Sequence, residues 1–222
     1  NNPILISSFG DGEPLFRGTL NQPIRYQYVP RTPLDGEYTI VKNTFGMNNS
    51  SRGWHQIKEH TGQTPNGYMM VVNGDKDYGG FFIANNVEIC PNTVYQFGAY
   101  FANLSNYSGI KPNIVFSIET LAGVVLASYE TGDIPQSANG NWQNFKFRYD
   151  NISETRVILR LSTKNAKGDG NDFAVDDIEF TTCGPVNQVS IVDYGSTANL
   201  CEGQTKSFTL TSTVGDWYDE PV

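Results

Sequence analysis

The sequence predicts an all-β protein: a jelly-roll β-sandwich followed by an incomplete second β module. The first observation is a series of short, alternating apolar segments at about ten-residue spacing, separated by turns rich in Asn, Gly, Asp and Pro. The second is the composition, which has 22 glycines, 12 tyrosines and a hydrophobic fraction of 38%. The third is that no segment shows the period of an amphipathic helix.

Strands are predicted wherever apolar residues alternate or form a short run bounded by turn residues. The clearest case is 93–104, where Tyr95, Phe97, Ala99 and Phe101 share one face. The remaining long segments, 14–34 and 43–67, lack this pattern and are predicted to be loops. Further strands of the sandwich are expected at 3–9, 37–41, 68–72, 80–83, 113–121, 124–129, 142–149, 156–161 and 170–180.

The character of the chain changes after Pro185. Residues 1–185 are enough for one sandwich with a sizeable core, whereas 186–222 are too few for another. Strand-like segments at 189–192 and 207–210 suggest that the second module is cut short. We therefore predict a sandwich at 1–185 and the start of a second, truncated β domain at 186–222.

Net charge and cysteine content limit the possible partners and the compartment. A net charge of −8 argues against nucleic acid and anionic membranes as partners and fits a secreted protein. No apolar run is long enough to insert in a membrane, and any export signal would already have been removed. Cys90 and Cys183 lie beside Pro or Gly at strand boundaries and are predicted to form a disulfide, which leaves Cys201 without an intrachain partner.

The strand at 170–180 carries the most informative charge. Alternation places Ala174, Asp176, Ile178 and Phe180 on one inward face. A buried carboxylate is costly, so Asp176 is expected to bind a metal ion, to accept hydrogen bonds from backbone amides or to pair with an arginine.

Catalytic motifs are not evident, and we predict that the protein is not an enzyme. The chain has two histidines and no Gly-x-Ser-x-Gly motif. Glu59-His60 lacks the second histidine of a zinc protease. A glycosidase-like carboxylate pair is left open, because such pairing is spatial and the chain has 23 acidic residues.

Four blocks of sequence together resemble the jelly-roll module repeated in large secreted surface proteins of Bacteroidetes, which are linked to gliding, adhesion or type IX secretion. The closing strand at 170–180 alone also resembles that of galactose-binding-like carbohydrate-binding modules, which implies a galactose-binding-like jelly roll. The chain after the four blocks contains LCEGQ at 200–204, which resembles the start of the immunoglobulin-like modules that often follow, so 186–222 would be the start of a truncated immunoglobulin-like domain. The four blocks are EHTG (59–62) with NGYMMVVN (66–73), CPNTVYQF (90–97), KPNI (111–114) with TGDIP (131–135), and GNDFAVDDI (170–178) with CGP (183–185).

This resemblance implies a structural calcium ion between the first strand region and the last strand. Asp176 would be one ligand, with Asp177, Asp35, Asp11 and Glu13 as further candidates. The family usually has an acidic residue just before the Phe-Gly of the first strand, where this sequence has Ser7 and Ser8.

The predicted function is extracellular binding or adhesion, most simply of a glycan or cell-surface polysaccharide, within a chain that carries further domains. The alternatives are a purely structural spacer and a glycan-active enzyme. Sugars stack on aromatic rings and take hydrogen bonds from amides and carboxylates. The candidate ligand-binding residues in or beside loops are Trp54, His60, Tyr78, Tyr107 and Trp142.

Overall fold

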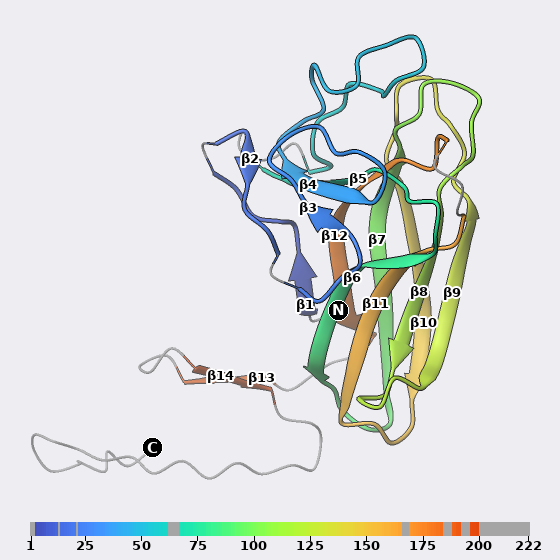
Figure 1. The fold of residues 1–222 in the computed structure, drawn as a ribbon. Helices are drawn as coiled ribbons and strands as arrows, with labels where there is room; N and C mark the ends of the chain where they lie inside the picture. The colour runs from blue at the N-terminus through green and yellow to red at the C-terminus, as the bar shows by residue number, and fades with distance from the viewer. Residues whose placement is uncertain are drawn as a thin grey trace, which may run out of the picture. The chain divides into compact units, whose positions relative to one another are not determined.

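The computed structural model describes residues 3–12, 14–20, 22–61, 67–165, 169–183, 188–191 and 196–199 (Figure 1). The chain divides into two compact units, Asn1–Pro185 and Val186–Val222. In the second unit, β13 (Gln188–Ile191) pairs antiparallel with β14 (Ser196–Asn199). The described residues contain no helix whose length and apolar character would let it cross a membrane.

The first unit is a sandwich of two sheets, and the predicted all-β jelly-roll class is confirmed. The larger sheet has the order β10-β7-β12-β5-β4-β2, with β1 added to β12 and β3 to β4. Its strands are β1 (Pro3–Ser7), β2 (Phe16–Arg17), β3 (Gln27–Tyr28), β4 (Glu37–Val41), β5 (Met69–Val72), β7 (Thr93–Asn103), β10 (Gln143–Asn151) and β12 (Phe173–Thr182).

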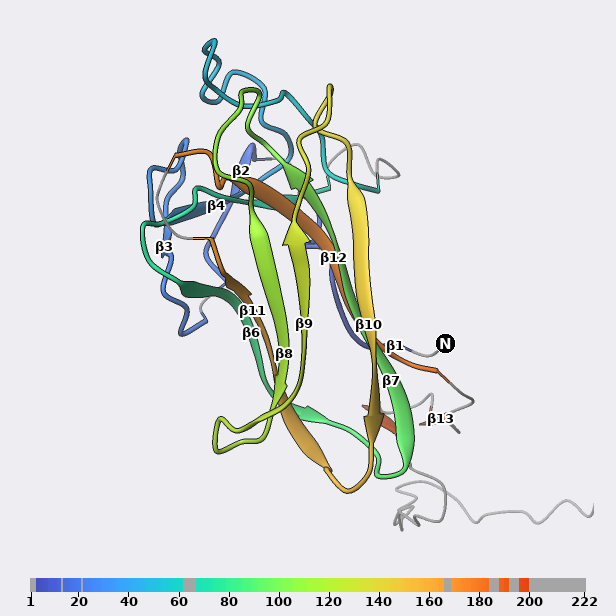
Figure 2. The same cartoon turned by 90° about the vertical axis from the view of Figure 1, so that its right-hand side faces the viewer.

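The smaller sheet packs against the larger one, and the core lies between them (Figure 2). Its order is β6-β11-β8-β9. Aromatic rings link the layers: Phe97 on the larger sheet lies 5.1 Å from Phe116 on the smaller one. The strands of the smaller sheet are β6 (Gly79–Glu88), β8 (Asn113–Glu119), β9 (Val125–Asp133) and β11 (Arg156–Thr163).

The two predicted loops have different structures. The segment predicted as a loop at 14–34 contains the two-residue strands β2 and β3. The loop after β4 contains no strand in its described residues 42–61, and it packs on the outer face of the larger sheet. It forms a second apolar cluster there, made of Val41, Met47, Trp54, Ile57, Met69, Val71, Ala102, Leu104 and Ala174.

A bulge in β12 corrects the predicted face of Asp176. The pairing of β12 with β7 shifts between Asp176 and Glu179, and Asp177 has a positive φ of 46°. One extra residue reverses the alternation, so Ile178 faces the sandwich core whereas Asp176 faces outward, opposite Tyr100. Asp176 is still buried, at 1% exposure, and the loop over the outer face supplies that cover.

The predicted disulfide between Cys90 and Cys183 is not present. Cys183 is a free, exposed cysteine at the end of β12, and its amide donates to the carbonyl of Val94 on β7. The carbonyl of Cys90 accepts the side-chain amide of Asn151, beside the turn that joins β10 to β11. The prediction for Cys201 concerns a residue outside the described ranges.

Candidate functional site

The site forms where the loop over the outer face meets the bulge of β12. Residues 59 and 60 come from the loop, Tyr100 from β7, and Trp142 lies just before β10. The bulge presents two consecutive carboxylates to them. We call this group the His60 site, and its members are Glu59, His60, Tyr100, Trp142, Asp176 and Asp177.

The carboxylate of Asp176 links the loop to the bulge by two hydrogen bonds. Its Oδ2 accepts the backbone amide of His60 at 2.9 Å, and its Oδ1 accepts the amide of Asp177 at 2.8 Å. Burial is the main cause that raises the pKa of Asp176 to about 8, and the negative charges of Asp177 and Glu59 also raise it. The two hydrogen bonds from backbone amides lower this pKa, but by less than burial raises it. Of the three roles expected for this carboxylate, acceptance of backbone amides is the one that the structure shows.

The ring of His60 is fixed on three sides. Its Nδ1 lies 2.7 Å from Oδ2 of Asp177. Its face stacks on Tyr100, with ring centroids 3.5 Å apart and planes at 21°. Trp142 approaches edge-on, at 5.8 Å and 74°. The side chains of His60 and Asp177 keep 25% and 21% exposure, so an aromatic surface with a carboxylate beside it faces outward.

Two further contacts fix the loop and the tryptophan. The indole Nε1 of Trp142 donates to the carbonyl of Lys58 at 3.1 Å. The carboxylate of Glu59, which is 8% exposed, accepts the hydroxyl of Thr61 at 2.5 Å. The site is therefore assembled before a ligand arrives, which lowers the conformational entropy that binding costs.

Sequence reasoning missed Tyr100, although a signal was available. The alternation at 93–104 places Phe97, Ala99 and Phe101 on the core face. Tyr100 therefore belongs to the opposite face, and it is only partly buried in the structure. An aromatic residue on the polar face of a strand indicates a contact outside the core.

Of the five predicted ligand-binding residues, only His60 and Trp142 come together. The exposed ring expected at Trp54 is not found, because Trp54 is 2% exposed in the second apolar cluster and its indole donates to Asp172 at 2.7 Å. Tyr107 lies at another loop, where burial and then its hydrogen bond to Asp169 raise its pKa to about 12. Tyr78 lies before β6 and is 68% exposed.

The predicted calcium ligands are not gathered at one point in the part of the chain that the structure describes. Asp176 and Asp177 are adjacent. Asp11 lies elsewhere, in an isolated β-bridge with Gly67. Asp35 lies near a different carboxylate, Asp172, and the charge of Asp35 helps to raise the pKa of Asp172. No group of three or more His, Cys, Asp or Glu side chains among the described residues is placed to hold a metal ion. Glu13 lies outside these residues. The described members of the set are therefore not brought together as expected, and calcium binding itself stays a prediction.

No protein-family model matches the sequence, and no curated protein matches it. Several solved structures are similar in fold. Arabinose-bound MgGH51 α-L-arabinofuranosidase is 12% identical with a TM-score of 0.44, over 66% of this chain and 22% of that one. An apo cyclase from Fischerella sp. is 12% identical with a TM-score of 0.49, over 68% and 75%. TmCBM61 bound to β-1,4-galactotriose is 18% identical with a TM-score of 0.38, over 65% and 81%.

These likenesses are remote, at 12% to 18% sequence identity. The chain spans less than a quarter of the arabinofuranosidase chain that it matches. The similar chains include two enzymes as well as a galactotriose-bound protein, so the choice of function depends on the site itself.

Proposed function

We propose that the first unit is a non-catalytic carbohydrate-binding module and that the His60 site is its binding site. The observation that carries this proposal is the aromatic group of His60, Tyr100 and Trp142, partly exposed on a sheet face with Asp177 at its margin. Aromatic rings bind the apolar faces of sugars, and carboxylates accept hydrogen bonds from sugar hydroxyls.

The neighbouring strand adds a suitable polar group. Asn144 on β10 pairs in register with Tyr100, so the two side chains lie on the same face, and Asn144 is exposed. An amide both donates and accepts hydrogen bonds, as a sugar hydroxyl does. The site therefore offers a stacking surface between a carboxylate and an amide, on strands that hold them rigidly.

The geometry supports binding over catalysis. Asp176 has the strongly raised pKa that a general acid needs, but it is 1% exposed and both of its oxygens accept backbone amides. It cannot reach a bound sugar without displacing the loop. A glycan-active enzyme remains a rival only if a second, exposed carboxylate pair acts on the ligand.

The location and setting in this proposal depend on the sequence. Four blocks resemble secreted Bacteroidetes surface modules, and the chain continues into a segment that resembles an immunoglobulin-like module. We infer a secreted or cell-surface protein in which this module binds glycan beside further domains of the same chain. A structural spacer is the alternative if no glycan binds.

Calorimetry against a broad polysaccharide and oligosaccharide panel tests the proposal. Stacking sites of this size give micromolar to millimolar affinity, about −4 to −8 kcal/mol. Trp142→Ala and Tyr100→Ala should each weaken binding, whereas Tyr78→Ala, an exposed aromatic elsewhere, should not. A flat panel would favour the spacer, and shortened oligosaccharides after incubation would favour the enzyme.

A further inference from the structure

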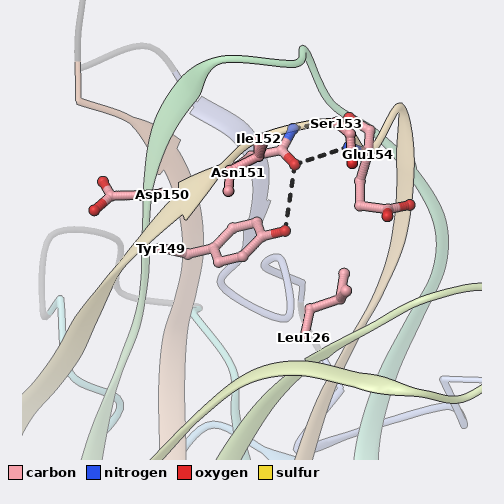
Figure 3. Close-up of a pocket in the computed structure, with 7 residues that line it drawn as sticks. All are labelled: Leu126, Tyr149, Asp150, Asn151, Ile152, Ser153 and Glu154. Atoms are coloured by element: carbon pink, nitrogen blue, oxygen red, sulfur yellow. Dashed lines mark hydrogen bonds between the residues drawn. The ribbon is translucent and has the colours of Figure 1, made fainter.

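A surface pocket lies apart from the His60 site (Figure 3). Its volume is about 220 Å³, and its walls come from β9, the end of β10 and the turn that follows. Because β9 and β10 are edge strands of the two different sheets, the pocket opens on the side of the sandwich where both sheets end. Its lining residues are Leu126, Tyr149, Asp150, Asn151, Ile152, Ser153 and Glu154.

Apolar side chains continue from the pocket onto the surface. Leu126 and the ring of Tyr149 pack on the core and form the apolar wall. Both views place the β8–β9 and β10–β11 turns at the same end of the sandwich (Figures 1 and 2). Four of the nine large apolar side chains exposed in the described residues belong to these turns and the adjoining start of β9, a concentration typical of an interaction surface. They are Leu121, Val124, Val125 and Ile152.

The neutral polar groups inside the pocket are already used. The hydroxyl of Tyr149 donates to Oδ1 of Asn151 at 3.3 Å, and the amide of Glu154 donates to the same oxygen at 3.0 Å. Nδ2 of Asn151 donates to the carbonyls of Cys90 and Glu154. The Asn151 side chain therefore has no capacity left to bind a sugar hydroxyl.

The remaining side-chain capacity is mainly negative. Asp150 forms an exposed ion pair with Arg148 at 2.8 Å. The carboxylate of Glu154 makes no side-chain hydrogen bond or ion pair within the described ranges, and Ser153 adds one hydroxyl at the exposed rim. Burial and then the charge of Glu154 raise the pKa of Tyr149, which agrees with a carboxylate that faces the pocket.

We propose that this pocket binds a Lys or Arg side chain from an extended protein segment that carries apolar residues on either side of it. The aliphatic stem would pack on Leu126 and Tyr149, and the cation would pair with Glu154. The flanking apolar residues would cover Val125 and Ile152, while the free edge of β9 could accept the segment as an added strand. An acidic chain, with a net charge of −8, also attracts a basic partner.

The test uses the full 222-residue chain and three matched peptides. Binding of each peptide is measured by the change in amide chemical shifts in NMR. The probes are Ac-Val-Lys-Val-NH2, the same peptide with norleucine, which keeps the stem but has no charge, and the same peptide with Glu. The lysine peptide should shift the amides of residues 125–126 and 149–154. Its affinity should exceed that of the others by about fivefold, the size of one partly exposed ion pair, and fall with salt.

A pair of charge-matched variants locates the effect. Glu154→Gln should remove the preference for lysine. Glu88→Gln is the control: it also removes one negative charge, from an exposed carboxylate that pairs with Arg156 and does not line the pocket. This variant should keep the preference for the lysine peptide. Melting temperatures of both variants should stay close to that of the parent, because neither carboxylate is buried in the core.

Three results would overturn the proposal. Equal binding of all three peptides would show that charge is not recognised. Loss of the preference in both variants would show a general field effect. If n-butylammonium shifts the same amides with the affinity of the lysine peptide, the pocket is a small-amine site and the protein segment is the wrong ligand. None of these results bears on glycan binding at the His60 site.

Discussion

The backbone amide of His60 donates a 2.9 Å hydrogen bond to the carboxylate of Asp176, although the two residues are 116 positions apart in the chain. This bond fastens the loop after β4 to the closing strand. Because the other oxygen of Asp176 accepts the amide of Asp177, one side chain fixes both the loop and the bulge. Asp176 thus positions the His60 site without facing the ligand.

Asp176→Ala should destabilise the protein by about 2 to 4 kcal/mol, because it leaves the backbone amides of His60 and Asp177, which lie under the loop and at the bulge, without acceptors. Urea unfolding measures this change, and Asp150→Ala, at an exposed ion pair, serves as the control. Glycan binding should weaken as well, since His60 and Asp177 lose their common support. A variant within about 0.5 kcal/mol of the parent would contradict this role.

The stability of the metal-free protein should fall as pH rises from 6 to 8. Burial raises the pKa of Asp176 from 3.8 to about 8, so across this range the folded protein holds a proton that the unfolded chain has released. The free energy of unfolding then decreases with pH, by at most about 1.4 kcal/mol per pH unit. Asp172, with a pKa of about 6, acts in the same direction but mostly below pH 6.

Urea unfolding at pH 6, 7 and 8 in chelator checks this expectation. Asp176→Asn should flatten the dependence. Its neighbours Glu59, His60 and Asp177 remain in the variant, so the difference from the parent isolates Asp176. A slope that is unchanged in Asp176→Asn would assign the pH dependence to another group.

The sequence was sufficient to predict the sandwich because its long strands follow simple alternation. On β7, Tyr95, Phe97 and Phe101 face the core as expected. On β12 the alternation rule failed at Asp177. This residue adopts a positive φ and reverses the alternation, and the residue types around it give no sign of this. Asp176 was correctly expected to be buried, but it lies on the other face.

Trp54 shows why the site was harder to predict than the fold. Its place in a polar, glycine-rich loop suggested an exposed ring, but that loop folds back on the sheet and buries it. Trp142, beside a similar turn, stays half-buried at the site. Whether a loop aromatic is exposed depends on where the loop packs, and that follows from contacts distant in the chain.

Trp54→Phe should destabilise the protein by about 1.5 to 3 kcal/mol, the value of a buried hydrogen bond to a charged group. The indole of Trp54 and the amide of Gly74 are the two donors to the carboxylate of Asp172, which is 7% exposed. Loss of one donor should also raise the pKa of Asp172 above about 6. Trp142→Phe is the control, because its indole bonds a carbonyl at a less buried position. Equal losses in both variants would point to packing instead of the hydrogen bond.

Cys183 should react with a maleimide in the folded, unreduced protein, because it is a free and exposed thiol. Cys183→Ser should change stability by less than about 0.5 kcal/mol, as surface substitutions usually do. Peptide mapping by mass spectrometry identifies the labelled cysteine. A peptide in which Cys183 is joined to Cys90 would restore the disulfide expected from the sequence and contradict the structure.

The calcium prediction has a direct test at Asp176. Asp177 and Glu59 place negative charge beside Asp176 under the loop, and these charges help to raise its pKa. A cation bound there would hold Asp176 ionised and would stabilise the folded state. At a calcium concentration about a hundred times the dissociation constant, the free energy of unfolding rises by roughly 2.7 kcal/mol.

The prediction therefore requires that a chelator lower the melting temperature by several degrees and that calcium restore it. Asp176→Ala should abolish this response, whereas Asp75→Ala, in an ion pair with Arg25, should keep it. If the curves with chelator and with calcium superimpose, Asp176 acts only as the hydrogen-bond acceptor that joins the loop to β12.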